Sequence, residues 1–213
     1  VTFITAQGIL ENVGLSYSGY MVAVMALMEI PAILIGVFLY QKFFSFQRTG
    51  NWLLLKSILS TKSVVLLLGG FAIGLLMNEN SWSSISPVVH GCFKGVLAFF
   101  LLDLGVVAQK QMGEAWKRKW IALSVAVVLP VFFGGIALLA AFFLKLPQGD
   151  QVLLAVLVGS ASYIAAPAAI RSSIAEANPS LYSALPLALT FPMNLLIGIP
   201  FYMELSVILV GLR

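Results

Sequence analysis

The sequence predicts an all-α membrane protein built from several membrane-spanning helices. Hydrophobic residues make up 61% of the 213 residues and charged residues only 9%, whereas soluble domains carry about 25% charged residues. The apolar residues gather in runs close to the roughly 20 residues that a membrane helix needs. Basic residues lie mainly between those runs, as in other polytopic membrane proteins. Together these observations predict a polytopic helical bundle.

Six apolar segments follow one another along the chain and predict six membrane helices. They cover residues 19–40, 63–77, 88–107, 120–144, 152–170 and 181–210. Polar stretches at 78–87 and 145–151 and basic stretches at 42–62 and 110–119 are expected to form loops. The chain begins inside a further apolar segment, so we expect that the N-terminal part of this helix precedes Val1.

The distribution of basic residues predicts the orientation of the helices. One group is Lys42, Arg48, Lys56 and Lys62, and a second group, two spans later, is Lys110, Lys117, Arg118 and Lys119. In the loops on the opposite side, at 78–87 and 145–151, Lys145 is the only basic residue. The basic loops are therefore expected in the cytoplasm, with the protein in the plasma (inner) membrane of a bacterium. Basic residues placed in this way do not form the stripe that binds nucleic acid, so no nucleic-acid partner is expected.

Residues that carry covalent chemistry are few. The chain contains one cysteine, Cys92, and one histidine, His90, which excludes an intrachain disulfide and a Cys/His metal cluster. The sequence has no P-loop, redox motif or nucleophile–base set. We therefore expect neither enzymatic activity nor a cofactor.

An internal repeat relates the two ends of the chain. Residues 1–7 (VTFITAQ) align with 161–167 (ASYIAAP) at an offset of 160. Further on, 30–36 (IPAILIG) resembles 191–198 (FPMNLLIG), and 36–40 matches 198–202 at an offset of 162. Five crossings separate the first pair, so the two repeats run through the bilayer in opposite directions. An inverted repeat of this kind is typical of secondary transporters.

A break is expected in the fifth apolar segment, within 152–171. Small and hydroxyl residues from Gly159 to Ala166 precede Pro167. Unpaired backbone at membrane depth persists only where it lines a cavity or is buried in protein, and secondary transporters place substrate and ion sites at such breaks. Residues 1–8 are expected to belong to the opposed broken helix of the first repeat.

Two sets of candidate site residues are predicted. The substrate set is Thr2, Phe3, Ile4, Thr5, Ser160, Ala161, Ser162, Tyr163 and Ile164; the sodium set is Ser160, Ser162, Glu29, Thr190 and Asn194; Asp103 is a further intramembrane polar residue. Hard cations take oxygen ligands, and an ionisable residue within a membrane segment is a functional hypothesis by default. The alternatives are close helix packing for the hydroxyl residues and structural polar contacts or ion pairs for the two acids.

Two motifs resemble the sodium-dependent bicarbonate transporter family. They are 161–171 (ASYIAAPAAIR) and 174–182 (IAEANPSLY), the second being similar to the family pattern IPxANPSxY. Weaker matches are 2–6, 28–32, and Lys94-Gly95 with Gly105. The chain differs where family members have a Ser-Ser-Ser-Asp type segment, since it has Ser-Ala-Ser-Tyr at 160–163, and its loop between the repeats is short, at 41–62.

The resemblance implies a protein of two inverted five-helix halves with two discontinuous helices crossing near the membrane midplane. Residues 1–41 are then the end of the first repeat, 42–62 a short cytoplasmic basic linker, and 63–213 the second repeat. It also implies a homotrimer that carries bicarbonate with sodium as the coupling ion and contacts a PII-like cytoplasmic regulator.

The function predicted from these observations is sodium-coupled uptake of bicarbonate, a small inorganic anion, by alternating access. One alternative is a transporter of the same fold that carries another small anion or is coupled to protons through Glu29 or Asp103. Another is a membrane sensor or scaffold that binds the ligand without transporting it.

Overall fold

The computed structural model is all-helical over the residues that it describes. These are 2–44, 56, 62–117, 120, 124–162 and 185–211, with short stretches between 166 and 183. The helices are α1 (Thr2–Val13), α2 (Tyr20–Phe44), α4 (Lys62–Leu76), α5 (Glu79–Lys117), α7 (Leu129–Phe143) and α8 (Gln148–Val158). A π-helical turn, η1 (Ser124–Val128), leads into α7. The last helix consists of η3 (Pro186–Thr190), α10 (Phe191–Met193), η4 (Asn194–Gly198) and α11 (Ile199–Gly211).

Three of the described helical stretches are long and apolar enough to cross a membrane. They are Tyr20–Tyr40, Ser124–Phe143 and Pro186–Gly211, and the apolar helix α8 is shorter. Proline is tolerated within such helices because neighbouring groups satisfy the carbonyls it leaves unpaired. The predicted all-α class is confirmed for the described part of the chain.

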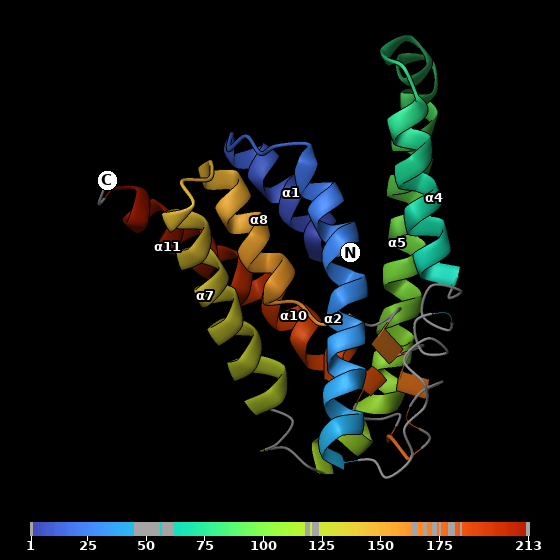
Figure 1. Cartoon of the computed structure of the whole chain (residues 1–213), viewed down its shortest axis with the longest axis vertical. Coiled ribbons are helices and arrows are strands. Elements are labelled where there is room, and N and C mark those ends of the chain that lie inside the picture. The colour runs from blue at the N-terminus through green and yellow to red at the C-terminus, as the bar shows by residue number, and fades with distance from the viewer. Residues whose placement is uncertain are drawn as a thin grey trace.

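The core of the molecule is built around α8. This helix lies among α1, α7 and α11 (Figure 1), and almost every residue from Gly149 to Val156 is buried. Helix α1 contributes Phe3, Ala6 and Leu10, which share one face at helical spacing. Lipid tails are as apolar as these side chains, so close packing rather than exclusion of water holds such helices together.

The helices alternate in direction along the chain (Figure 1). Helices α2 and α5 end at the lower end of the view, and α7 begins there. The loops at 14–19, 77–78 and 144–147 lie at the upper end. The basic residues Lys42 and Lys110 therefore lie toward one end of the molecule, as the charge pattern predicts.

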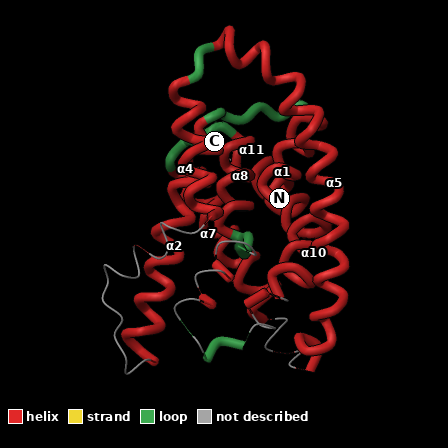
Figure 2. The backbone as a smooth tube through the Cα atoms, turned by 90° about the vertical axis from the view of Figure 1, so that its right-hand side faces the viewer, coloured by secondary structure: helices red, strands yellow, loops and turns green. Residues whose placement is uncertain are grey.

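Helices α4 and α5 lie on opposite sides of the molecule in Figure 2. Helix α4 packs against α2, and α5 contacts η3. Apolar side chains such as Leu66, Leu75, Phe99 and Leu102 are exposed on them. Exposed apolar helix surfaces of this kind suit contact with lipid or with other membrane helices.

The polar loop predicted at 78–87 is wrong, because α5 already begins at Glu79. Asn78 starts the helix: its side-chain oxygen accepts a hydrogen bond from the Ser81 backbone N–H at 2.8 Å, which is an N-cap interaction. Pro87 lies inside α5 and leaves the Ser83 carbonyl without its usual donor. The Ser86 hydroxyl lies 3.5 Å from that oxygen and donates to it.

Two other predicted boundaries are also wrong. Helix α5 continues to Lys117, through most of the basic stretch predicted as a loop at 110–119. Helix α8 begins at Gln148, within the loop predicted at 145–151. Pro147 has extended backbone angles (φ −54°, ψ 150°) and precedes the first turn, and Asp150 supplies the negative charge that a helix N-terminus favours.

Candidate functional site

Helix α8 ends where the sequence changes to small and hydroxyl residues. Gly159 caps it, and its N–H donates to the Ala155 carbonyl oxygen at 2.8 Å. Ser162 is not helical, and helical backbone is found again at Ala166. In an unbroken helix the Ala166 N–H would donate to the carbonyl of residue 162, but here it donates to the Ser162 hydroxyl at 3.2 Å. The Ser162 side chain thus satisfies a backbone group at the break.

Tyr202 of α11 fixes the position of the break. Its side chain is fully buried, and its hydroxyl donates to the Pro130 carbonyl oxygen of α7 at 3.1 Å. A Cβ atom at Gly159 would lie 2.5 Å from this hydroxyl and 2.9 Å from the carbonyl oxygens of Ala155 and Pro130. A Cβ at Gly134 would lie still closer to the Tyr202 ring. The three helices therefore approach so closely only because both positions are glycine.

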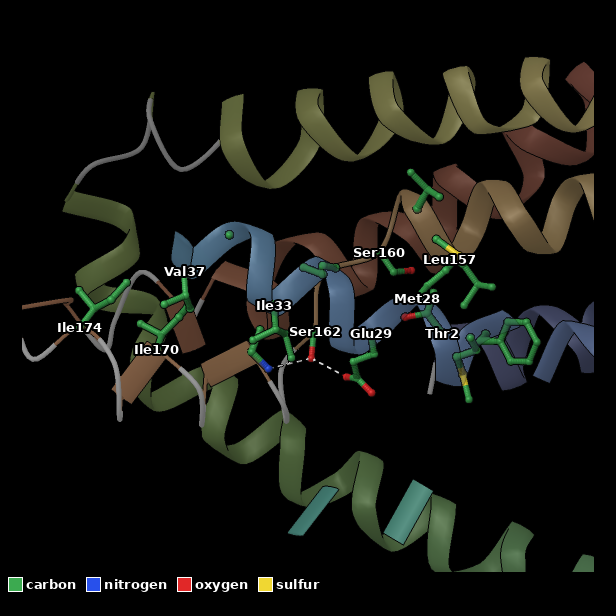
Figure 3. A pocket seen from close by; sticks show the side chains of 17 residues that line it. Thr2, Met28, Glu29, Ile33, Val37, Leu157, Ser160, Ser162, Ile170 and Ile174 are labelled. Carbon is green, nitrogen blue, oxygen red and sulfur yellow. Dashed lines mark hydrogen bonds between the residues drawn. The ribbon is translucent and has the colours of Figure 1, made fainter. Parts of the chain in front are cut away.

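A cavity of about 670 Å³ opens beside the break (Figure 3). It lies between the start of α1, the middle of α2 and the segment that follows α8. Its lining residues are Thr2, Phe3, Met25, Met28, Glu29, Ala32, Ile33, Gly36, Val37, Leu157, Val158, Ser160, Ala161, Ser162, Ala166, Ile170 and Ile174. The wall is therefore mainly aliphatic and methionine-rich, with four polar side chains from three parts of the chain. Few polar groups in an apolar cavity are typical of a small-ligand site.

Glu29 is the charged side chain among the described residues that line this cavity. The Ser162 hydroxyl donates a hydrogen bond to its Oε1 at 3.3 Å (Figure 3). The two residues are 133 positions apart in sequence, and their contact joins α2 to the break in the helix that begins with α8. The contact brings together one residue from each of the two repeats predicted from the sequence.

A second polar cluster surrounds Asn194 of η4, next to the end of α8. Its side-chain nitrogen donates to the Gly159 carbonyl oxygen at 2.7 Å and lies 3.4 Å from the Ser160 hydroxyl. Asn194 is 1% exposed, and its Oδ1 has no hydrogen-bond partner among the described residues. A buried acceptor left without a donor is costly. Ser160 lines the cavity and contacts Asn194, so it connects the two clusters.

The structure places the predicted site residues in different surroundings. Those that line the cavity are Thr2, Phe3, Ser160, Ala161, Ser162 and Glu29. Ile4 packs against the apolar core instead, Thr5 lies half-buried on α1 away from the cavity lining, and Thr190 is buried in η3. Asp103 is exposed on α5 and does not line the cavity. Tyr163 and Ile164 lie outside the described residues.

Asp150 is a buried charged residue that the sequence did not single out. It is fully buried in the first turn of α8. Its carboxylate accepts hydrogen bonds from the Ser18 N–H at 2.6 Å, the Ser18 hydroxyl at 2.7 Å and the Tyr20 hydroxyl at 2.7 Å. A Cβ at the neighbouring Gly149 would lie 2.2 Å from the Ser16 carbonyl oxygen. The loop between α1 and α2 is thus attached to the end of α8 that lies farthest from the cavity.

The same loop holds a second acidic contact. The Tyr17 hydroxyl donates to Glu11 at the end of α1. Burial, together with the hydrogen bond and the negative charge of Glu11, raises the pKa of Tyr17 to about 12. The tyrosine therefore stays protonated and keeps this contact throughout the physiological pH range.

One comparison with known proteins identifies the family. Among curated proteins, none matches this sequence. The family described as the Na+-dependent bicarbonate transporter superfamily matches residues 1–207 of the 213, which is almost the whole chain. The match agrees with apolar helices that are long enough to cross a membrane and with a broken helix beside a mainly apolar cavity that carries four polar side chains. The chain is an integral membrane protein of the Na+-dependent bicarbonate transporter superfamily.

Proposed function

We propose that this protein is a secondary active transporter that takes up bicarbonate together with sodium through the cavity beside α8. The observation that carries the proposal is the convergence of Thr2, Ser160, Ser162 and Glu29 on one cavity at a helix break. This arrangement occurs in a chain that belongs to a transporter family. Binding and release of an ion require no covalent step, and the proposal gives no residue a catalytic role.

The hydroxyl groups suit bicarbonate, which has both a proton to donate and oxygen atoms that accept. A serine or threonine hydroxyl can donate one hydrogen bond and accept others. Thr2 and Ser162 supply such groups from two sides of the cavity, and Ser160, whose hydroxyl donates to the Val156 carbonyl oxygen, supplies an acceptor. We assign them, with Phe3 and Ala161 in the adjacent wall, to the substrate site, and the exposed Asp103 is not part of it.

The oxygen atoms around Asn194 support a sodium site next to the anion. The Gly159 carbonyl, the Ser160 hydroxyl and the orphan Oδ1 of Asn194 lie in one small region. Sodium is a hard cation, and hard cations take oxygen ligands. Rotation of the Asn194 amide would turn Oδ1 toward the other two oxygens. Ser162 and Glu29 complete the proposed ion pathway, and Thr190 lies four positions before Asn194 within the same helix.

Alternating access is proposed from the arrangement of the repeats. Helix α2 and the helix Pro186–Gly211 run in opposite senses in Figure 1, which supports an inverted repeat. In inverted-repeat transporters, one part of the protein moves against the other around a fixed site. By family resemblance, the proposal extends to a homotrimer in a bacterial inner membrane, with the basic loops in the cytoplasm and a PII-like regulator bound there.

A second candidate function is proton-coupled transport of bicarbonate or another small anion. The observation that favours it is Glu29, the charged side chain in the described lining of the cavity. In this candidate, coupling to protons through Glu29 takes the place of coupling to sodium. A third candidate is a sensor that binds the anion without moving it.

Uptake of labelled bicarbonate by the protein in proteoliposomes separates these functions. Uptake that rises when a sodium gradient is imposed supports the proposal. Uptake driven equally by a proton gradient without sodium supports the second candidate. Saturable binding without uptake supports the sensor, and neither binding nor uptake overturns all three.

A further inference from the structure

The hydrogen bonds of Ser162 use its single hydroxyl proton and one of its two lone pairs. One lone pair accepts the Ala166 N–H at 3.2 Å, so the hydroxyl proton is directed to Glu29 at 3.3 Å. A hydroxyl has a single proton to donate. An anion that enters the cavity and uses the Ser162 proton must therefore displace Glu29 from it.

The charge of Glu29 adds to this competition. Among the described residues that line the cavity, α1 contributes Thr2, the segment after α8 contributes Ser160 and Ser162, and none brings a positive charge. An ionised Glu29 would therefore repel a bound anion in an apolar cavity, where electrostatic interactions are stronger than in water. A sodium ion bound to Glu29 removes both obstacles at once.

We propose that Glu29 acts as a tethered competitor of the substrate anion. With no cation bound to it, Glu29 holds the Ser162 hydroxyl and keeps the anion out; when a sodium ion binds to Glu29, the hydroxyl becomes available. This inference rests on the proposed function and explains why anion binding at this cavity requires a cation. The cation dependence is then a property of one side chain on α2.

The test is bicarbonate binding to the purified protein, measured without sodium and with saturating sodium at pH 8.5. The wild type should bind bicarbonate at least tenfold more weakly without sodium. Glu29→Gln keeps the size of the side chain without its charge, and it should bind without sodium within about threefold of the wild-type affinity measured with sodium. Glu29→Met, which resembles the neighbouring Met25 and Met28, should behave in the same way if the glutamine variant does not fold. Glu204→Gln alters an exposed acid outside the cavity and should keep the wild-type dependence on sodium.

Two further measurements make the test specific. The gain caused by Glu29→Gln should be smaller when Ser162→Ala is present, because the contested hydroxyl is then absent and only the relief of charge repulsion remains. By linkage, bicarbonate should tighten sodium binding to the wild type by the same factor by which sodium tightens bicarbonate binding.

The outcomes separate a failure of the proposed transport function from a failure of the tethered-competitor proposal. If the wild type binds no bicarbonate under any condition, the proposed function fails. If the wild type requires sodium and both Glu29 variants require it equally, the proposed function stands and the tethered competitor is refuted. A gain in sodium-free binding that is unaffected by Ser162→Ala also refutes it.

Discussion

The buried carboxylate of Asp150 accepts two hydrogen bonds from Ser18, one from the backbone N–H at 2.6 Å and one from the hydroxyl at 2.7 Å. This contact ties the loop that follows α1 to the first turn of α8. Helix α1 begins at Thr2 and α8 ends at Val158, and both of these residues line the cavity. This contact, at the end of α8 far from the cavity, therefore fixes how the start of α1 and the end of α8 lie relative to each other.

Asp150→Ala should destabilise the protein by about 2–4 kcal/mol, because it leaves the Ser18 and Tyr20 donors without an acceptor. Asp150→Asn keeps the shape of the side chain and one acceptor oxygen, so it should lower the free energy of unfolding by less. The measurement is the free energy of unfolding in detergent with a chemical denaturant. Glu204→Ala, at an exposed position, should change it by no more than about 0.5 kcal/mol. Equal stability of Asp150→Ala and wild type would show that the contact contributes nothing.

Two adjacent glycines of α7 provide a matched comparison. A Cβ at Gly134 would lie 2.1 Å from the Tyr202 hydroxyl oxygen, whereas a Cβ at Gly135 meets nothing within 4 Å. Gly134→Ala should lower the melting temperature, because overpacking typically costs about 1–3 kcal/mol. Gly135→Ala should leave it unchanged or raise it, because alanine is the better helix former by about 1 kcal/mol. The opposite order of melting temperatures would contradict the close packing of α7 against Tyr202.

Asn194→Ala should weaken sodium activation of transport. It removes the orphan Oδ1 and leaves the Gly159 carbonyl without its donor. The sodium concentration for half-maximal bicarbonate uptake should rise at least tenfold, which corresponds to about 1.4 kcal/mol. Leu196→Ala, two positions along the same helix and exposed, should leave it unchanged. An unaltered sodium dependence of Asn194→Ala would remove this residue from the proposed ion site.

The Tyr17–Glu11 contact predicts a pH dependence at the alkaline end. The pKa of Tyr17 is raised to about 12 in the folded protein, compared with about 10 for the unfolded chain. The stabilisation from this group is therefore complete below pH 10 and is lost as the pH rises from 10 to 12. Unfolding midpoints of the wild type and Tyr17→Phe should converge over that interval. A constant difference between them would show that Tyr17 does not titrate with a raised pKa.

The sequence predicted the helix break well, because its cause is local. Glycine and serine residues ahead of Pro167 have low helix propensity, and α8 does end at Val158. The start of α5 was missed for a local reason as well: Asn, Glu and Ser at 78–84 suit a loop, but Asn78 also caps a helix. Local composition alone does not distinguish these two uses of the same residues.

The sequence predicts a role for Asn194 but none for Asp150, and it predicts the contacts of neither residue. Asp150 stands in a short polar stretch, and its partners Ser18 and Tyr20 lie 132 and 130 positions earlier, so only the folded structure brings them together. Asn194 is predicted as a sodium ligand because it lies one turn after Thr190, the position that matches Glu29 in the repeat. Its contact with Gly159 depends on how the last helix packs against α8, which the sequence pattern does not specify.

Sodium-driven uptake of labelled bicarbonate by Ser162→Ala proteoliposomes tests most directly that the cavity beside α8 is the transport site. Loss of a hydrogen bond to a charged ligand costs about 1.5–3 kcal/mol, so kcat/KM for uptake should fall roughly 10- to 100-fold. Ser84→Ala, at an exposed position on α5, should transport as the wild type does. Wild-type uptake and sodium dependence in Ser162→Ala would contradict the account.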